Sequence, residues 1–181
     1  MQSLVWESPI SPFSQRPIQR KAVWLTDCKC KYKYSELVFD PHPLPPWFTK
    51  MQEKVFEVAG VKGMGLNSCN ANYYPDGHHH LDWHSDNEPL FGSQDKGRDV
   101  PILSLSIGAG RMFLVKHLAS GKVVPVQLHS GDLLFMGGAL QSTHKHKVPK
   151  SQVPGPRLNF TWRRIVHHTD ECIQCGLCVD T

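Results

Sequence analysis

Histidine and carboxylate side chains are concentrated in one short stretch of the sequence, residues 78–88. His84 and Asp86 stand two positions apart, so on a β-strand both side chains would leave the same face. An imidazole and a carboxylate held close together suit a divalent metal, and a second histidine from elsewhere would complete a two-histidine, one-carboxylate set for Fe(II). The spacing alone also occurs among surface histidines, and we assign the histidines at 78–80 to a loop.

Two more histidines and a pair of arginines lie toward the other end of the chain. His144 and His146 are candidates for the remaining ligand, and either imidazole would serve a metal equally well. Arg157, Asn159 and Arg163 have the same parity, so on a strand they point to one face. A rise of about 3.3 Å per residue separates the two arginine Cα atoms by roughly 20 Å, and side chains reaching inward leave about 6–8 Å, the span of a five-carbon diacid. The alternative is one structural and one solvated arginine.

The elements that must position these residues are mostly short strands separated by turns. Alternating or apolar runs predict strands at residues 31–34, 103–107, 112–115, 123–128, 133–136 and 158–162. One helix is predicted after Pro45–Pro46 from a stripe of apolar residues that ends at Gly60, namely Trp47, Met51, Val55 and Val58. We therefore expect a mainly β fold with one or two helices, in which antiparallel strands form a jelly-roll-like barrel.

The length of 181 residues suits one domain with tails. We divide it into a flexible leader at 1–21, a domain at 22–166 and a Cys-rich tail at 167–181. No apolar run approaches the roughly 18 residues of a membrane span, and the first residues lack a signal-peptide core, so we expect an intracellular protein that is not secreted. The net charge of +4 permits a nucleic-acid partner without requiring one. The grouped cysteines, including Cys28 with Cys30, favour thiol or metal roles over disulfides.

Four motifs together resemble the AlkB family of Fe(II)- and 2-oxoglutarate-dependent dioxygenases. They are Asn72-Tyr73-Tyr74, His84-Ser85-Asp86-Asn87-Glu88-Pro89, His146-Lys147-Val148-Pro149-Lys150, and Arg157 to Arg163. The resemblance runs from about residue 23 to residue 165 and is strongest to the animal homologues that repair alkylated nucleic acid. It implies a double-stranded β-helix (jelly-roll) core.

The resemblance also implies a role for individual residues. The iron ligands would be His84, Asp86 and His146, where the choice of His146 over His144 rests on the residues that follow it. The 2-oxoglutarate site would use Asn72, Tyr74, Arg157, Asn159 and Arg163. On the substrate side, Glu88 stands where family members place an acid facing the base, and Trp24, Tyr32 and Tyr34 fall where the nucleotide-recognition lid begins.

The implied activity is oxidative demethylation. N-methyl groups of the 1-methyladenine and 3-methylcytosine type would be removed from DNA or RNA as formaldehyde, while 2-oxoglutarate and O₂ give succinate and CO₂. We expect a monomer in the nucleus or cytoplasm, with single-stranded nucleic acid favoured. The rival hypotheses are a hydroxylase with the same iron site that acts on a protein side chain or small molecule, and a non-catalytic nucleic-acid-binding module.

Two features leave alternatives open. The alternating run at residues 29–34 would present tyrosines on one face and lysines on the other, which suits either a single strand of nucleic acid or an edge strand protected by lysines. Near the end of the chain, Cys172, Cys175 and Cys178 have a C-x₂-C-x₂-C spacing. That tail is a disordered segment, a second metal site for zinc completed by His167 or His168, or an iron–sulfur or other redox motif.

Overall fold

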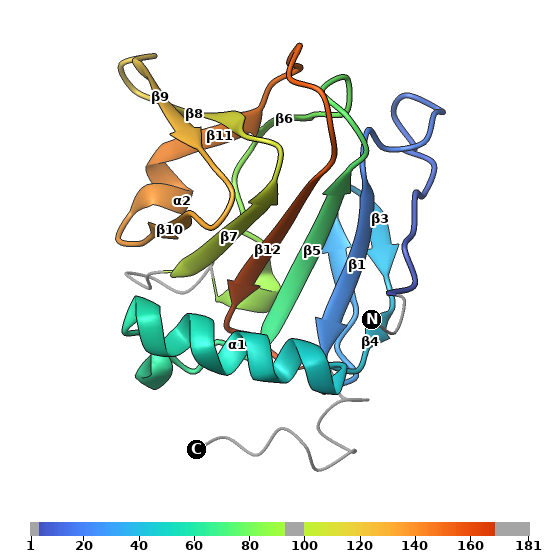
Figure 1. Ribbon diagram of the computed structural model, residues 1–181, viewed down its shortest axis with the longest axis vertical. Coiled ribbons are helices and arrows are strands. Elements are labelled where there is room, and N and C mark those ends of the chain that lie inside the picture. Colours follow the sequence, from blue (N-terminus) through green and yellow to red (C-terminus); the bar gives the residue numbers. More distant parts are fainter. Residues whose placement is uncertain (1–3, 93–99, 169–181) are drawn as a thin grey trace.

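The architecture is known from a computed structural model that describes residues 4–92 and 100–168. Two sheets pack against each other, and a small hairpin stands beside them (Figure 1). The larger sheet has the order β10-β7-β12-β5-β1-β4, with β1 Lys21–Thr26, β4 Pro41–His42, β5 Ser68–Tyr74, β7 Ile102–Gly108, β10 Leu133–Met136 and β12 Arg157–Arg163. The smaller sheet has the order β6-β11-β8-β9, with β6 Leu81–His84, β8 Arg111–His117, β9 Val123–Leu128 and β11 His144–Val148.

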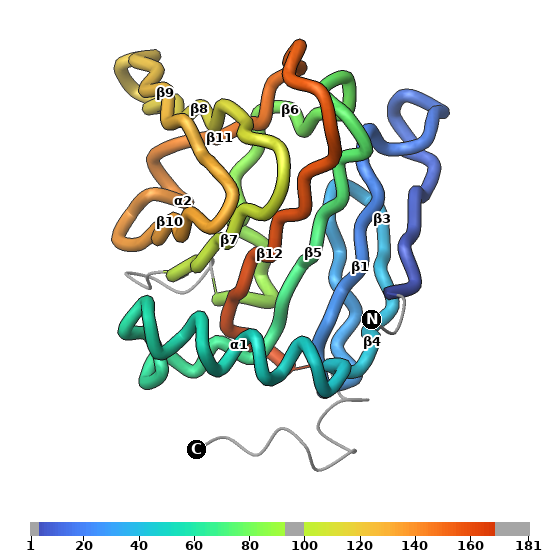
Figure 2. The backbone as a smooth tube through the Cα atoms, viewed as in Figure 1, coloured from blue at the N-terminus to red at the C-terminus, as the bar shows by residue number. Residues whose placement is uncertain are grey.

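The centre of the larger sheet has one apolar face and one polar face. Strand β12 runs antiparallel between β5 and β7 (Figure 2), and its Asn159 lies opposite Asn72 on one side and Ser106 on the other. Phe160 and Trp162 point to the opposite face and join a buried apolar cluster. The polar face turns toward the smaller sheet. The mainly β jelly-roll prediction is confirmed, and Arg157, Asn159 and Arg163 share one face of β12 as predicted.

Helix α1 (Pro46–Ala59) covers the apolar face, lying across β12, β5 and β1 in Figure 1. It begins after Pro45 and ends at Gly60, whose φ of 68° is the left-handed conformation that glycine adopts without strain. Phe48 and Phe56 are buried, and both rings contact Trp162. The helix prediction is confirmed, but Val58 of the predicted stripe is 68% exposed because the buried face is centred on the phenylalanines.

Short helical turns complete the fold. They are η1 (Lys62–Met64), η2 (Pro89–Phe91) and α2 (Leu140–Thr143), the last directly before β11. In the described parts of the chain, no helix is both long and apolar enough to cross a membrane.

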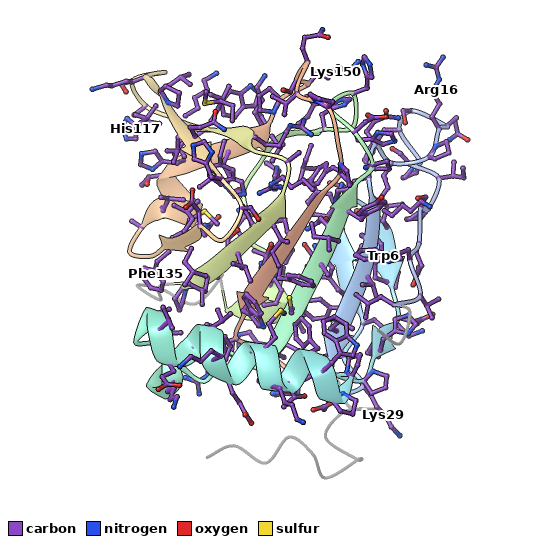
Figure 3. The ribbon with its side chains drawn as sticks, in the orientation of Figure 1. Trp6, Arg16, Lys29, His117, Phe135 and Lys150 are labelled. Atoms are coloured by element: carbon purple, nitrogen blue, oxygen red, sulfur yellow. The ribbon has the colours of Figure 1, made fainter. Side chains whose placement is uncertain are left out.

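The segment before β1 contacts the larger sheet along residues 4–20. Glu7 and Ala22 exchange backbone hydrogen bonds, each with an N···O distance of 2.9 Å. The Trp6 ring lies 5.7 Å from that of Tyr73, and Figure 3 shows Trp6 beside β1. The division of the chain into leader, domain and tail stays a prediction, although these contacts differ from what we expect of a flexible leader.

The hairpin β2 (Tyr32–Tyr34) and β3 (Leu37–Phe39) contains the alternating lysines and tyrosines. Tyr32 is buried, whereas Lys33 is exposed and forms an ion pair with Glu36 at 3.1 Å. Lys31 pairs in the same way with Asp40 at 3.2 Å. The predicted two faces are therefore present, and both lysines already have acidic partners.

Arg111 at the start of β8 holds together the loops that flank the smaller sheet. Its guanidinium is buried and donates hydrogen bonds to the backbone carbonyls of Asp76, Gly77, His79 and Pro149 at 2.6–3.4 Å. Those carbonyls belong to the connection before β6, which ends at His84, and to the loop after β11, which contains His146. Arg111 thus fixes the spacing of two site-bearing strands.

We expect Arg111→Met to lower the free energy of unfolding by about 3 kcal/mol, because it leaves several buried carbonyls without their charged donor. Urea unfolding followed by circular dichroism measures this. Lys50→Met, the matched change on the exposed face of α1, should alter stability by no more than about 0.5 kcal/mol. Equal effects of the two substitutions would contradict a clamping role for Arg111.

Candidate metal and cosubstrate site

Two imidazoles and a carboxylate meet between the sheets. His84 ends β6 and lies opposite His146 of β11 in the antiparallel ladder. Nε2 of His84 is 3.8 Å from Oδ1 of Asp86, and Nε2 of His146 is 3.7 Å from Oδ2 of the same carboxylate. The ring of His144 instead lies 4.8 Å from that of His117. The structure therefore brings together the three residues expected as iron ligands and keeps His144 apart from them.

Both imidazoles are poised as neutral ligands. Nδ1 of His84 lies 2.7 Å from the carbonyl oxygen of Asp82. Because a carbonyl can only accept, Nδ1 carries the proton and Nε2 keeps its lone pair for a metal. Burial, followed by the nearby His146, lowers the pKa of His84 to about 3, and burial also lowers the pKa of His146. Neither ring needs to lose a proton before it can bind a cation at neutral pH.

Asp86 is oriented by two groups outside the predicted ligand set. Its backbone N–H donates to Oε1 of Gln141 at 2.9 Å, and Nη2 of Arg163 donates to its Oδ2 at 2.5 Å. Burial alone would raise the pKa of Asp86, but Arg163 and the two imidazoles hold it well below its ordinary value. The carboxylate is therefore anionic, although it is buried.

The polar face of the larger sheet forms one wall of the cavity that reaches these ligands. That wall is lined by Asn70, Asn72, Tyr74, Ser104, Asn159, Thr161 and Arg163. Nδ2 of Asn159 donates to Oγ of Ser104 at 2.8 Å, which fixes the amide within the sheet. Arg157 lies on the same face of β12 at its first residue, where its guanidinium is 5.4 Å from the ring centre of Tyr74 and donates to Oγ of Ser106.

Arg20 is a member of this wall that the sequence did not identify. Its Nε donates to Oδ1 of Asn72 at 2.5 Å, and its guanidinium lies 5.5 Å from the ring centre of Tyr34. Gln141 was missed in the same way. Neither belongs to a motif, and Arg20 stands in the segment that we expected to be a flexible leader.

The residues expected on the substrate side form a layered contact. The hydroxyl of Tyr32 donates to Oε1 of Glu88 at 2.7 Å. Burial, followed by the charge of Asp86, raises the pKa of Glu88 to about 7. Tyr34 meets His84 edge-on, with ring centres 5.9 Å apart. Trp24 is completely buried and stacks on Tyr32 with ring centres 4.8 Å apart, and it is not among the residues that line the cavity.

Comparison with known proteins identifies the superfamily of this chain. The sequence profile of the 2OG-Fe(II) oxygenase superfamily matches residues 6–163. The chain belongs to that superfamily. This oxygenase is 32% identical to the DNA oxidative demethylase ALKBH2 of Mus musculus, in a match that covers 82% of the chain and 63% of the relative. It is 33% identical to the alpha-ketoglutarate-dependent dioxygenase alkB homolog 3 of Bos taurus, with coverages of 74% and 48%.

The sequence similarity to these relatives places the oxygenase in the AlkB family. The chain spans between about half and just under two-thirds of their lengths. The solved structure of OsALKBH1 superposes with a TM-score of 0.56 at 20% identity, covering 81% of this chain and 79% of that one, and it supports the fold alone.

The donor sets of this oxygenase fit the groups that its superfamily uses, Fe(II) and 2-oxoglutarate. The ligand atoms of His84, Asp86 and His146 all lie within 4.8 Å of one another, and the mixed nitrogen and oxygen set suits Fe(II). Nε and Nη1 of Arg157 and of Arg163 are buried, and no acceptor among the described residues reaches them. Because buried donors are nearly always paired, these four N–H-bearing atoms fit an anionic ligand such as a dicarboxylate.

The cysteines expected as a second metal site, Cys172, Cys175 and Cys178, lie outside the described residues.

Proposed function

We propose that this AlkB-family oxygenase is an oxidative demethylase of DNA or RNA. It removes N-methyl groups of the 1-methyladenine and 3-methylcytosine type. In balance, the methyl carbon leaves as formaldehyde, the ring nitrogen retains a hydrogen or lone pair, and 2-oxoglutarate with O₂ gives succinate and CO₂. The observation that carries the proposal is the buried group of His84, Asp86 and His146 beside a polar face that presents unpaired arginine donors.

One group of residues binds the metal, and a second group binds the cosubstrate. Bound iron supplies the activation of O₂ and the oxidation of the methyl group. His84 and His146 offer neutral nitrogen donors, and Asp86 offers an anionic oxygen whose orientation is set by Arg163. The cationic Arg157 and Arg163, with the amides of Asn72 and Asn159, bind the carboxylates and keto oxygen of 2-oxoglutarate.

The substrate side suits a flipped, methylated base. Glu88 lies two residues beyond Asp86, where its ionised form favours a positively charged methylated ring, and Tyr32 donates a hydrogen bond to it. Tyr34 lines the same cavity as the metal ligands and offers an aromatic face for stacking.

A second cavity supports binding of the nucleotides that flank the base. It has a volume of about 420 Å³ and shares Arg20, Tyr34 and Leu81 with the first. Its wall includes Arg16, which Figure 3 shows on a loop at the rim of the molecule, and Trp83. Nζ of Lys147 and of Lys116 lie 4.9 Å and 5.9 Å from the ring centre of Trp83. Aromatic rings among cations suit a single strand, whose bases stack while cations bind its phosphates.

We therefore propose single-stranded nucleic acid as the preferred substrate. We further propose that the protein acts as a monomer, in the nucleus or the cytoplasm where such strands occur. Relatives named as a DNA oxidative demethylase support the substrate class.

The test is reconstitution under anaerobic conditions with Fe(II) and 2-oxoglutarate, followed by addition of air and an oligonucleotide. The oligonucleotides carry one 1-methyladenine or 3-methylcytosine, as DNA or RNA, single-stranded or in duplex. Formaldehyde and succinate are measured together. We expect equal amounts of the two products, with the single-stranded form converted fastest.

The control variant His84→Ala removes one metal ligand and should give neither product. Succinate without formaldehyde from the parent protein would support the alternative, a hydroxylase that acts on a protein side chain or a small molecule. If folded, iron-loaded protein gave no succinate with any oligonucleotide, the proposed demethylase activity would be wrong.

A further inference from the structure

Two segments far apart in the sequence meet at a place that does not line the cavity of the metal ligands. One is the connection between β1 and β2, which contains Cys28 and Cys30, and the other follows β12 and contains His168. The potential ligand atoms of these three residues all lie within 4.8 Å of one another. This group lies outside the set of residues assigned to the iron, the cosubstrate and the base.

The cysteine-bearing connection is held in place by the body of the protein. Nε1 of the buried Trp24 donates to the carbonyl oxygen of Cys30 at 2.9 Å. The backbone N–H of Cys28 donates to Oγ1 of Thr26 at 3.3 Å. Lys29, between the two cysteines, extends outward at the edge of the molecule in Figure 3. The two thiols are thus presented together while the intervening side chain faces solvent.

The histidine-bearing segment is fixed independently. Ile165 is buried, and the backbone N–H groups of Val166 and His167 donate to the carbonyl oxygen of Leu90 at 3.0 Å and 3.3 Å. These contacts bring Nδ1 of His168 to 3.6 Å from Sγ of Cys30. Both sides of the cluster are therefore positioned by contacts that do not depend on a metal.

The donor set and its spacing match zinc. In a tetrahedral zinc site the Zn–S and Zn–N bonds are about 2.3 Å and 2.0–2.1 Å, which separates neighbouring sulfur and nitrogen ligands by about 3.6 Å. The distance between Sγ of Cys30 and Nδ1 of His168 has this value. Thiolates prefer zinc over the harder cations that carboxylates bind.

We propose that Cys28, Cys30 and His168 bind a zinc ion, with the two thiols bound as thiolates after loss of their protons. Structural zinc sites normally have four protein ligands. The fourth ligand is a water molecule or a further side chain; Cys172, Cys175 and Cys178 follow His168 within ten residues in the sequence but lie outside the described residues.

Zinc at this position ties the end of the oxygenase domain to the strand that carries Tyr32. The cysteine connection leads directly into β2, while Leu90, which accepts from the histidine segment, belongs to the turn that follows Glu88. The ion therefore links the segment that leads to Tyr32 with the segment that contacts the turn after Glu88, and these two residues share a hydrogen bond. Its role is to position this part of the substrate wall, and no step of the oxidation passes through it.

The experiment is a zinc titration of the full chain against a chromophoric chelator, after removal of bound metals. It is performed in a His146→Ala background, so that zinc at the iron site does not add to the count. We expect one tight zinc equivalent per chain. The Cys28→Ser/Cys30→Ser variant should lose this equivalent, and His168→Ala should weaken its affinity at least tenfold. His167→Ala, the same change one residue earlier, should keep the affinity of the background protein.

Cobalt substitution gives a second readout that does not depend on activity. Thiolate-to-cobalt charge-transfer absorption is expected in the background protein and absent from Cys28→Ser/Cys30→Ser, with circular dichroism confirming that both are folded. A Cys172→Ser/Cys175→Ser/Cys178→Ser variant identifies the fourth ligand, because unchanged absorption and affinity assign it to water and a partial loss assigns it to the tail. Tight zinc binding that survives loss of Cys28 and Cys30, whether or not it needs the tail, would overturn the proposal.

Discussion

His146→Ala is expected to abolish iron-dependent turnover, lowering succinate formation by at least about 100-fold, since even groups that only orient metal ligands are worth about 10–100-fold. The reason is geometric: Nε2 of His146 lies 3.7 Å from the Asp86 carboxylate and directly across the ladder from His84. The measurement pairs iron per chain, determined after anaerobic loading, with the initial rate of succinate release. Both quantities should fall together.

The same strand offers a matched control. His144 stands two residues earlier, and its ring lies against His117 rather than against Asp86. His144→Ala should therefore keep the iron content and the succinate rate of the parent protein. The reverse pattern, in which His144→Ala loses iron and His146→Ala retains it, would show that the ligand assignment is wrong.

Arg163→Met should weaken Fe(II) binding by about 10–100-fold, because Asp86 loses the guanidinium that orients its carboxylate. The same change leaves a buried carboxylate without its cationic partner, so the free energy of unfolding without metal should fall by about 3–5 kcal/mol. Titration of the folded protein with Fe(II) under anaerobic conditions measures the first effect, and urea unfolding measures the second.

Two further variants separate charge, geometry and general damage. Arg163→Lys keeps a cation but loses the planar fork, so it should fold better than Arg163→Met and still bind 2-oxoglutarate weakly. Arg164→Met makes the same deletion at the next residue, whose side chain is exposed, and should leave iron affinity unchanged. If Arg163→Met and Arg164→Met had the same iron affinity, Arg163 would have no role in orienting Asp86.

The sequence predicts the strands that have one polar and one apolar face better than those whose two faces are both apolar. Residues 103–107 and 158–162 alternate and were predicted, because alternation is the signature of a strand between two different environments. The sequence does not predict strand β1, because Ala22, Val23, Trp24 and Leu25 are all apolar and no alternation marks the strand. The helix prediction succeeded because its stripe begins after Pro45–Pro46 and ends at a glycine.

Within the site, the sequence predicts residues that lie close together along the chain and misses contacts between distant segments. His84 and Asp86 lie two residues apart, and Asn159 and Arg163 share one strand, so short motifs could identify them. Arg20 reaches Asn72 across 52 positions of sequence, and Gln141 reaches Asp86 across 55. Such pairs arise only when the strands have assembled, and no spacing within one segment predicts them. The roles of the individual site residues stay predictions until the variants are measured.

The central place of β12 has a consequence for how the protein is made. This strand is the last one in the described sequence, yet it fills the gap between β5 and β7. During synthesis, the facing edges of β5 and β7 stay unpaired until residues 157–163 have been made. Sheets closed by such distant segments fold slowly, and open edges invite pairing with other chains. A nascent chain halted before residue 157 would thus lack both arginines of the cosubstrate wall and the strand that protects its neighbours from aggregation.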